Sequence, residues 1–284
     1  MIISVYKNEG ETPLQALDRT RLEHGIEDSV PMTYAGRLDP LAEGLLLILT
    51  GEDVHKKDEY NGLSKVYEFT ILFGVATDTG DILGKIVSEI SEEKEYPPRK
   101  GARISLLRNR FSRLPDCEEP FQDGHSFSSL LKSFEGSYEQ EYPLYSSKTV
   151  DGMPLWQYAR ENKIPEKIPT HKVKIESINF LGSEEKSTTD LEKEIVERIT
   201  KVKGDFRQEE ILNAWKEFCV CVRQDLTQDL VQNKFLLVNC VAEVSSGTYI
   251  RKLCEDIGKK LGTPALAWSI KRTKIGEMGI FDII

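Results

Sequence analysis

The sequence has no apolar run long enough to cross a membrane. Its longest uninterrupted apolar stretch runs from Leu45 to Leu49, far short of the roughly 20 residues that a spanning helix needs. The opening residues, Met1 to Lys7, show neither the charged-then-apolar layout of a secretory signal nor the Arg-rich layout of a transit peptide. We therefore expect a soluble, cytoplasmic protein that contacts no membrane.

Cysteine is also scarce, with five copies in 284 residues. Cys219 and Cys221 are separated by one residue, but no matching Cys or His pair follows that would complete a zinc site. We interpret the cysteines as ordinary reduced, partly buried thiols and expect no bound metal.

Positive charge is in deficit, with 38 Lys and Arg against 47 Asp and Glu and a formal net charge of −9. This argues only weakly against a nucleic-acid partner, because RNA responds to the local field of a cleft more than to total charge. Residues 96–115 contain six basic residues and no acidic one, whereas residues 183–235 contain nine basic and twelve acidic ones. We expect phosphate contacts from the basic run, with a merely solvated loop as the alternative; the run consists of Arg99, Lys100, Arg103, Arg108, Arg110 and Arg113.

What the chain does contain is an ordinary globular balance, 39% hydrophobic and 30% charged. Its length fits one large domain or two small ones. Strand patterns cover residues 2–6, 42–50, 65–73, 171–181 and 235–244, and helical patterns cover residues 13–23, 127–134, 155–162, 191–200, 209–222 and 248–261. Residues 84–90 resume extended character after a polar turn at 77–81, which predicts a hairpin, and residues 92–126 look irregular. These patterns predict a mixed α+β fold with a central sheet.

Five separated segments carry the functional signal. The most specific is Tyr34-Ala35-Gly36-Arg37-Leu38-Asp39-Pro40-Leu41-Ala42, continuing to Gly44. A bare Leu-Asp-Pro is more often a turn or a helix N-cap, so the other segments decide its meaning. They are Lys7-Asn8-Glu9-Gly10-Glu11-Thr12-Pro13, Lys65-Val66-Tyr67 with Thr77-Asp78-Thr79-Gly80-Asp81 downstream, Pro143-Leu144-Tyr145-Ser146-Ser147-Lys148 continuing to Gly152 and Tyr158-Ala159-Arg160, and Ser246-Gly247-Thr248-Tyr249-Ile250-Arg251.

In order and approximate spacing, these segments resemble the TruB family of tRNA pseudouridine-55 synthases, from residue 7 to about residue 280. The resemblance implies the pseudouridine synthase fold, with a mixed, mostly antiparallel central sheet, flanking helices and a cleft for RNA. It also implies an isomerase that needs no cofactor, acts as a monomer and modifies the TΨC-loop uridine of tRNA.

Isomerising uridine breaks the N-glycosidic bond, turns the uracil and rejoins it through carbon, with a carboxylate as nucleophile or base. The resemblance assigns that role to Asp39. Arg251 resembles the family arginine that pairs with the carboxylate, keeps it ionised and orients it. Tyr67 resembles the tyrosine that stacks on the flipped uracil.

Other residues are assigned to substrate binding on the same resemblance. Tyr249 and Ile270 resemble residues that line the same pocket, although simple core packing explains them nearly as well. Lys7 and Lys148 contact either the fold or the RNA backbone. Arg37, inside the catalytic loop, is expected to bind substrate.

The chain departs from the family pattern in three ways. Tyr34 stands where the family usually has a histidine that helps to hold the RNA loop, so we expect Tyr34 to bind substrate through a different contact. Asn8 replaces the opening proline. The chain stops soon after Lys271-Arg272-Thr273, so we expect one catalytic domain over residues 1–284 without a C-terminal PUA domain. Residues 92–126 and 183–235 are expected to be insertions, and the acidic second one to be a packed helical addition or a protein contact.

Two other functions stay open. One is an RNA chaperone that folds tRNA with weak or no catalysis, although pure binding requires none of Asp39, Tyr67 and Arg251. The other is a synthase that acts on a different RNA, including a guide-RNA-dependent one.

Overall fold

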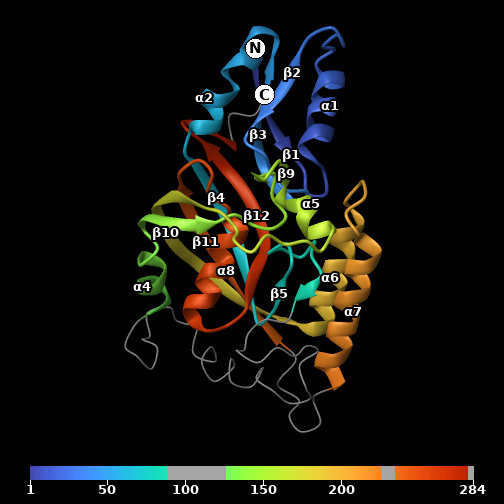
Figure 1. Cartoon of the computed structure of the whole chain (residues 1–284), viewed down its shortest axis with the longest axis vertical. Coiled ribbons are helices and arrows are strands. Elements are labelled where there is room, and N and C mark those ends of the chain that lie inside the picture. Colours follow the sequence, from blue (N-terminus) through green and yellow to red (C-terminus); the bar gives the residue numbers. More distant parts are fainter. Residues whose placement is uncertain (88–125, 225–233, 281–284) are drawn as a thin grey trace.

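The computed structural model describes residues 1–87, 126–224 and 234–280 (Figure 1). The basic run from Arg99 to Arg113 and nearly all of the segment 92–126 lie outside the described residues. In chain order the elements are β1 (Ile2–Lys7), α1 (Pro13–Glu23), β2 (Met32–Ala35), β3 (Ala42–Thr50), η1 (Gly51–Lys56), α2 (Lys57–Gly62), β4 (Lys65–Phe73), β5 (Ala76–Thr77), β6 (Ile86–Val87), α4 (Phe127–Lys132), β7 (Gly136–Glu141), β8 (Thr149–Val150), β9 (Met153–Pro154), α5 (Leu155–Arg160), β10 (Thr170–Ser187), α6 (Thr188–Thr200), α7 (Gln208–Gln224), β11 (Lys234–Val244), α8 (Ile250–Leu261), β12 (Ala265–Ile275) and β13 (Met278–Gly279).

One mixed sheet forms the centre of the molecule. Its strands follow the order β1-β3-β12-β4-β11-β10-β7, with β2 paired to β3 and β13 paired to β12. The pair β3–β12 is parallel, and the other pairs in this sheet are antiparallel. The predicted α+β fold with a mixed, mostly antiparallel sheet is therefore confirmed.

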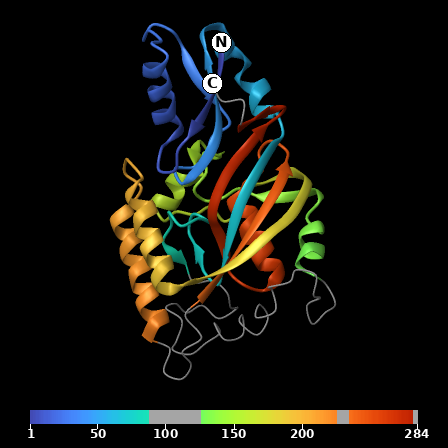
Figure 2. The same ribbon diagram turned by 180° about the vertical axis from the view of Figure 1, so that it is seen from behind.

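Helices cover both faces of this sheet. Successive residues of a strand point to opposite faces, and on β4 Ile71 packs into the core cluster that contains α8 and α4, whereas Leu72 packs into the cluster that contains α6 and α7. Figures 1 and 2 show α6 and α7 as an adjacent pair along one side of the sheet. The two helices predicted within residues 183–235 are confirmed, and both pack against the sheet.

One end of the molecule contains the N-terminal elements β1, α1, β2 and β3, drawn in blue in Figure 2. The Thr12 hydroxyl accepts from the Gln15 N–H while the Gln15 side chain accepts from the Thr12 N–H, and Pro13 occupies the first helical position. This capping box fixes the start of α1 as predicted. The chain before α1 contacts the Asp39 loop, because the Gly10 N–H donates to the Pro40 carbonyl at 2.9 Å.

The sequence patterns miss six of the described strands, namely β2, β7, β8, β9, β12 and β13. β2 has only four residues, too few to show an alternation. β12 was not assigned because Ala265 to Trp268 are buried on both faces, and such a run shows no polar alternation. The predicted hairpin near residue 80 forms between the short strands β5 and β6 and not with β4. α4 ends at Lys132, two residues before the predicted end.

Within the described residues, no helix is long and apolar enough to span a membrane. Cys219, Cys240 and Cys254 are buried, and Cys221 is exposed. The same part of the chain contains no group of three or more His, Cys, Asp or Glu side chains that could hold a metal ion.

Candidate active site

The centre of the candidate site is an ion pair between residues far apart in the sequence. Arg251 Nε donates to Asp39 Oδ2 at 2.7 Å, and Arg251 Nη2 donates to Asp39 Oδ1 at 3.3 Å. Two parallel bonds of this kind fix the position and the plane of a carboxylate. The Arg251 side chain is buried, whereas that of Asp39 is 35% exposed, so the carboxylate is held on one side and open on the other.

Backbone carbonyls hold Arg251 in turn. Its Nη1 donates to the Thr79 carbonyl, and its Nη2 donates to the Tyr145 carbonyl at 3.2 Å. Burial alone lowers the pKa of a guanidinium, but Asp39 and Asp81 leave the pKa of Arg251 above its ordinary value. Arg251 is therefore a fixed cation with little freedom to turn.

A second carboxylate lies beside the pair. Asp81 Oδ2 is 3.9 Å from Arg251 Nε, and Asp81 Oδ1 accepts from Thr79 Oγ1 at 2.7 Å and from the Leu83 N–H at 3.0 Å. Burial raises the pKa of Asp81 to about 6; Arg251 opposes the rise and the negative charge of Asp39 adds to it. Asp81 therefore changes charge close to neutral pH.

Lys7 supports the loop that carries Asp39. Its side chain is fully buried, and its Nζ donates to the carbonyls of Asn8, Pro40 and Ala42. Burial lowers the pKa of Lys7 to about 8. The structure shows Lys7 in contact with the fold, which is one of the two roles that the sequence left open.

The loop is also held by Arg272, a residue that sequence reasoning did not single out. Arg272 is fully buried, and it donates to the carbonyls of Leu45 and Gly36 at 2.8 and 2.9 Å. Its strand β12 runs parallel to β3 so closely that a Cβ at Gly44 would lie 2.2 Å from the Arg272 carbonyl oxygen. The sequence places Arg272 in Lys271-Arg272-Thr273 near the end of the chain, but its role becomes visible only once β12 is paired with β3.

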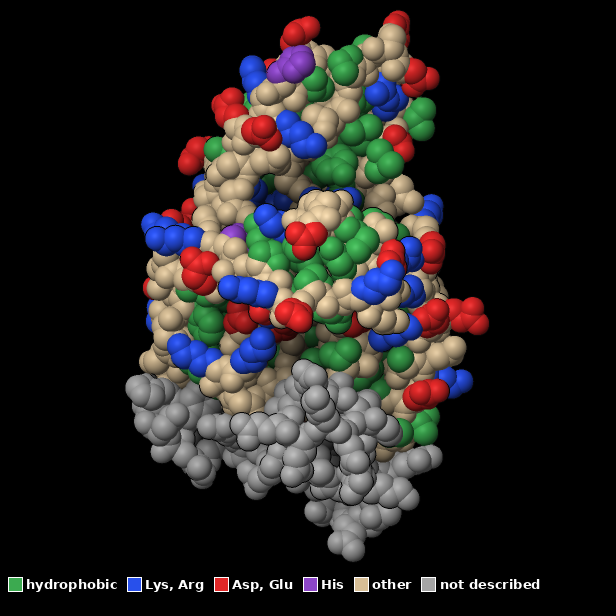
Figure 3. Space-filling view, viewed as in Figure 1, with side chains coloured by type: hydrophobic (Ala, Val, Ile, Leu, Met, Phe, Trp, Pro, Cys, Tyr) green, Lys and Arg blue, Asp and Glu red, His purple; other side chains and the backbone are tan. Residues whose placement is uncertain are grey.

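The Asp39 carboxylate opens into a cleft of about 570 Å³. Tyr67 from β4, Tyr249 before α8 and Ile270 from β12 line this cleft together with Asp39 and Arg251. Figure 3 shows this face hollowed between the N-terminal end and the rest of the molecule, with Lys and Arg side chains at the hollow. The structure thus brings together the three residues assigned to catalysis and the two assigned to the pocket.

The other residues predicted to bind substrate do not all line the cleft. Arg37 is exposed and lines the cleft. Tyr34 lies on β2, packs beside an apolar cluster and has the Lys57 ammonium 5.5 Å from its ring centroid, and it is not among the described residues that line the cleft. Lys148 is also not among them; its ammonium lies 5.1 Å from the Tyr142 ring. Substrate binding by Tyr34 and Lys148 stays a prediction.

Several lining residues had no role in the sequence interpretation. Trp156 and Arg160 come from α5, and Phe206 and Arg207 come from the turn between α6 and α7. Trp156 is 41% exposed, unusual for so large an apolar side chain. Tyr158-Ala159-Arg160 was part of a matched segment, but residues 201–207 carried no signal.

Comparison with known proteins decides the family. The model described as "TruB family pseudouridylate synthase (N terminal domain)" matches residues 29–112 and 115–206, more than half of the chain. The chain belongs to the TruB family. Arg251, Tyr249 and Ile270 lie beyond the matched ranges, so it is the structure that places them beside Asp39 in this TruB-family chain.

Curated TruB-family relatives match nearly the whole chain. "tRNA pseudouridine synthase B" of Thermosipho melanesiensis is 29% identical over 99% of this chain and 66% of its own length. "tRNA pseudouridine synthase 4" of Saccharomyces cerevisiae is 30% identical over 89% of this chain and 65% of its own length. This chain therefore spans 66% and 65% of the length of these two relatives. Among solved structures, a chain of a Cbf5-Nop10-Gar1 complex aligns with 98% of this chain and 50% of its own length, at 15% identity and a TM-score of 0.47; a likeness so distant says nothing about what this chain binds.

Proposed function

We propose that this TruB-family chain is a tRNA pseudouridine synthase that isomerises the TΨC-loop uridine (position 55) of tRNA. The observation that carries the proposal is the Asp39 carboxylate, fixed by Arg251 at 2.7 Å yet 35% exposed toward a cleft. The names of the two relatives above support the same reaction and substrate class.

The reaction moves one bond and needs no oxidant. The bond between uracil N1 and ribose C1′ breaks, a bond between uracil C5 and C1′ forms, C5 loses a proton and N1 gains one. Asp39 serves as nucleophile or base, and both roles require the ionised carboxylate. Arg251 favours that ionised form, because an opposite charge in contact stabilises it.

The cleft fits a flipped nucleotide. Its volume of about 570 Å³ lies within the range of about 300–1,000 Å³ that ligand pockets occupy. Tyr67 and Ile270, both nearly buried, offer an aromatic and an aliphatic surface for the two faces of a uracil. The cost of extruding the base is offset by this stacking and by contacts to the neighbouring phosphates.

Charge at the rim suits a polyanion despite the net charge of −9. Arg37 and Arg160 line the cleft, and Arg37 is exposed. A guanidinium at a cleft mouth attracts phosphate through the local field. We extend the proposal to a TΨC stem-loop as the bound element, to a monomer as the active form and to the cytoplasm as its location.

The test is to incubate the protein with unmodified tRNA and to map pseudouridine. Wild type should form it at the TΨC-loop position, and Asp39→Asn should lower the rate by about a thousandfold or more, the scale on which loss of an essential nucleophile or base acts. Asp39→Asn should still bind tRNA, because it keeps the shape of the side chain.

Other results would reject the proposal. Pseudouridine absent from the TΨC loop, or full activity of Asp39→Asn, contradicts it. Faster folding of tRNA with no pseudouridine formed would favour the chaperone instead. Pseudouridine formed only in another RNA would keep the chemistry and replace the substrate.

A further inference from the structure

The connection between α6 and α7 lies at the wall of the cleft that contains Asp39. Three of its residues contribute to this wall, Asp205, Phe206 and Arg207. The helices α6 and α7 themselves pack in the core cluster on the face of the sheet opposite α8. Residues 198–207, from the last turn of α6 through this connection, are called the clamp segment below. It contacts the supports of Arg251 at one point and the supports of Asp39 at another.

Arg207 makes the first contact. Its Nη1 lies 2.7 Å from Asp78 Oδ2 and its Nη2 lies 3.3 Å from Asp78 Oδ1, and its guanidinium carbon lies 4.4 Å from the centroid of the Tyr145 ring. Asp78 precedes Thr79, whose carbonyl accepts from Arg251, and the Tyr145 carbonyl accepts from Arg251 as well. One side chain of the clamp segment therefore ties together the two backbone segments that hold Arg251.

The backbone of Arg207 supports a functional role for its side chain. Its φ is +62°, in the left-handed region that is strained for a non-glycine residue. Glycine would adopt this conformation without strain. An arginine held there by a bidentate carboxylate contact and a ring contact indicates that the side chain offsets the backbone cost.

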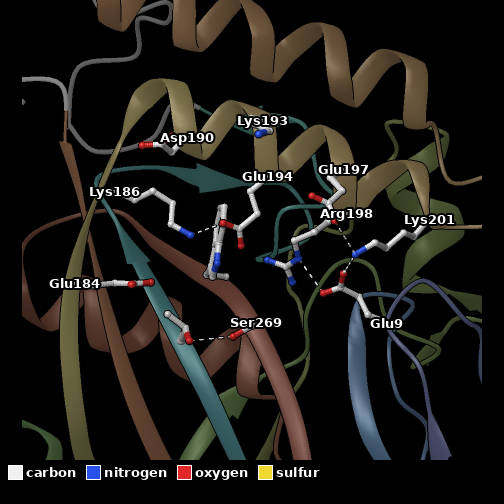
Figure 4. A pocket seen from close by; sticks show the side chains of 12 residues that line it. Glu9, Glu184, Lys186, Asp190, Lys193, Glu194, Glu197, Arg198, Lys201 and Ser269 are labelled. Atoms are coloured by element: carbon white, nitrogen blue, oxygen red, sulfur yellow. Dashed lines mark hydrogen bonds and ion pairs between the residues drawn. The ribbon is translucent and has the colours of Figure 1, made fainter.

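Arg198 and Lys201 make the second contact. Arg198 Nε donates to Glu9 Oε2 at 2.8 Å, and Lys201 Nζ lies 3.5 Å from Glu9 Oε1; Figure 4 shows both side chains directed at Glu9. The neighbouring Gly10 packs so tightly that a Cβ there would lie 2.8 Å from the Lys201 carbonyl oxygen. The Gly10 N–H donates to the Pro40 carbonyl at 2.9 Å, one residue after Asp39.

The groove beside this contact is better explained as a support than as a ligand site. It has a volume of about 580 Å³, but three cations on its wall, Lys186, Arg198 and Lys201, already contact carboxylates. The Arg198 guanidinium also lies 5.1 Å from the centroid of the Trp268 ring, and within the described residues its buried Nη atoms have no hydrogen-bond partner. A cation so buried depends on Glu9 for its neutralisation. This contact therefore holds α6 against Glu9, whose neighbour Gly10 donates to the Asp39 loop.

We propose that the clamp segment is a positioning device that sets the geometry of the Asp39–Arg251 pair. Arg207 acts on the Arg251 side through Asp78 and Tyr145, and Arg198 acts on the Asp39 side through Glu9. The proposal deepens the proposed function and rests on it for its kinetic test. Misplacement of a reacting group by about 1 Å costs on the order of a hundredfold in rate, so a clamp at both partners acts on the chemical step.

The main experiment compares Arg207→Gly with Arg223→Ala. The glycine variant removes the contacts to Asp78 and Tyr145 and also relieves the left-handed backbone. Arg223→Ala is the matched control, because Arg223 pairs with Glu192 between the same two helices at 2.6 Å but is not among the described residues that line the cleft. Rates are measured in a single turnover with saturating enzyme, at a temperature where circular dichroism shows each variant folded.

We expect Arg207→Gly to slow this step by about tenfold to a hundredfold while tRNA affinity changes by less than about threefold. Arg223→Ala should keep the wild-type rate, and Arg207→Lys should give an intermediate rate because it retains one ion pair. Glu9→Gln should slow the step by about threefold or more. A wild-type rate in Arg207→Gly overturns the proposal. So does a loss of affinity with an unchanged saturating rate, since that identifies Arg207 as an RNA contact.

A second readout needs no RNA. The ¹⁵N–¹H signal of Arg251 Nε, which donates to Asp39 at 2.7 Å, reports the ion pair in the free protein. It should be protected from solvent exchange in wild type and in Arg223→Ala, and shifted and less protected in Arg207→Gly. An unchanged signal in Arg207→Gly overturns the proposal. If wild type forms no pseudouridine, the proposed function fails, and this signal alone decides whether the clamp segment positions the pair.

Discussion

The loop of residues 36–44 and the clamp segment of residues 198–207 both determine where Asp39 lies, but they do so by different means. The loop is held by backbone groups: Lys7 and Arg272 donate to its carbonyls, and Gly10 donates to the carbonyl of Pro40. The clamp segment acts through charged side chains, with Arg207 on Asp78 and Arg198 on Glu9. The first kind of support is specified by glycines and buried cations, and the second by ion pairs.

This difference bears on which substitutions each region of this chain can tolerate. A backbone-held loop tolerates few changes, because a carbonyl or a glycine cannot be replaced from another part of the chain. An ion pair between two side chains is transferable, since any fold that brings an opposite charge to the same place provides it. Substitutions in and around the two regions test this division, and the change expected to have the largest effect is at Arg251.

The largest effect is expected from Arg251→Lys, the point where both kinds of support meet. An ammonium keeps the charge but cannot donate in parallel to Asp39 and also reach the Thr79 and Tyr145 carbonyls. We expect the single-turnover rate to fall by about a thousandfold, the scale of an arginine that organises a reacting centre. Near-normal activity would mean that charge alone suffices and that the bidentate geometry is irrelevant.

Gly44→Ala tests the backbone-held region by itself. A Cβ at Gly44 would lie 2.2 Å from the Arg272 carbonyl oxygen, at a φ of +108°, so β3 and β12 must separate. We expect the free energy of unfolding in urea to fall by about 3 kcal/mol. Gly51→Ala is the matched control: its φ is +60° but nothing lies within 4 Å of the added Cβ, so its cost should be about 1 kcal/mol. Equal losses in the two variants would show that the close approach of β12 costs nothing.

The same division explains what could be read from the sequence. The motif around Asp39 predicts the reacting carboxylate, and the Ser246–Arg251 segment predicts its partner, because both segments carry residue types that the chemistry requires. Lys7 was ambiguous between fold and RNA, since its burial depends on β1 lying against β3. Arg207 gave no signal, because its partners Asp78 and Tyr145 are distant in sequence and only the packed helices bring it to them. β12 was missed since it is buried on both faces along its first half.

Asp81→Asn tests the second carboxylate beside Arg251. Asp81 shares Arg251 with Asp39, and burial raises its pKa to about 6. Below pH 6 Asp81 is neutral, so Arg251 is balanced by Asp39 alone and holds that carboxylate more tightly, which weakens it as nucleophile or base. We expect the single-turnover rate of wild type to fall below about pH 6. In Asp81→Asn the rate at pH 7.5 should be about tenfold lower, with no inflection near pH 6.

The same substitution that lowers the rate is expected to raise the free energy of unfolding near neutral pH. A carboxyl whose pKa in the folded state lies above its unfolded value of 3.8 binds its proton more tightly when folded, so its stabilising effect is complete below pH 3.8 and is lost as the pH rises through 6. The free energy of unfolding of Asp81→Asn minus that of wild type should therefore be more positive at pH 7.5 than at pH 4. An inflection near pH 6 that persists in the variant would assign it to another group.

The smallest effect is expected at the rim, where Arg160 meets the clamp segment only through an exposed ion pair. Arg160 lines the cleft and pairs with Asp205 at 3.0 Å, but the two side chains are 39% and 81% exposed, so the pair contributes little to folding. We expect Arg160→Ala to leave the unfolding midpoint and the saturating rate unchanged. It should weaken tRNA binding by about threefold and reduce the slope of log affinity against log salt concentration by about one. Lys163→Ala, at a comparably exposed ion pair with Glu161 that is not among the described cleft residues, should change none of these. A lower saturating rate in Arg160→Ala would extend the clamp to α5, because it would show that a rim charge also positions the catalytic pair.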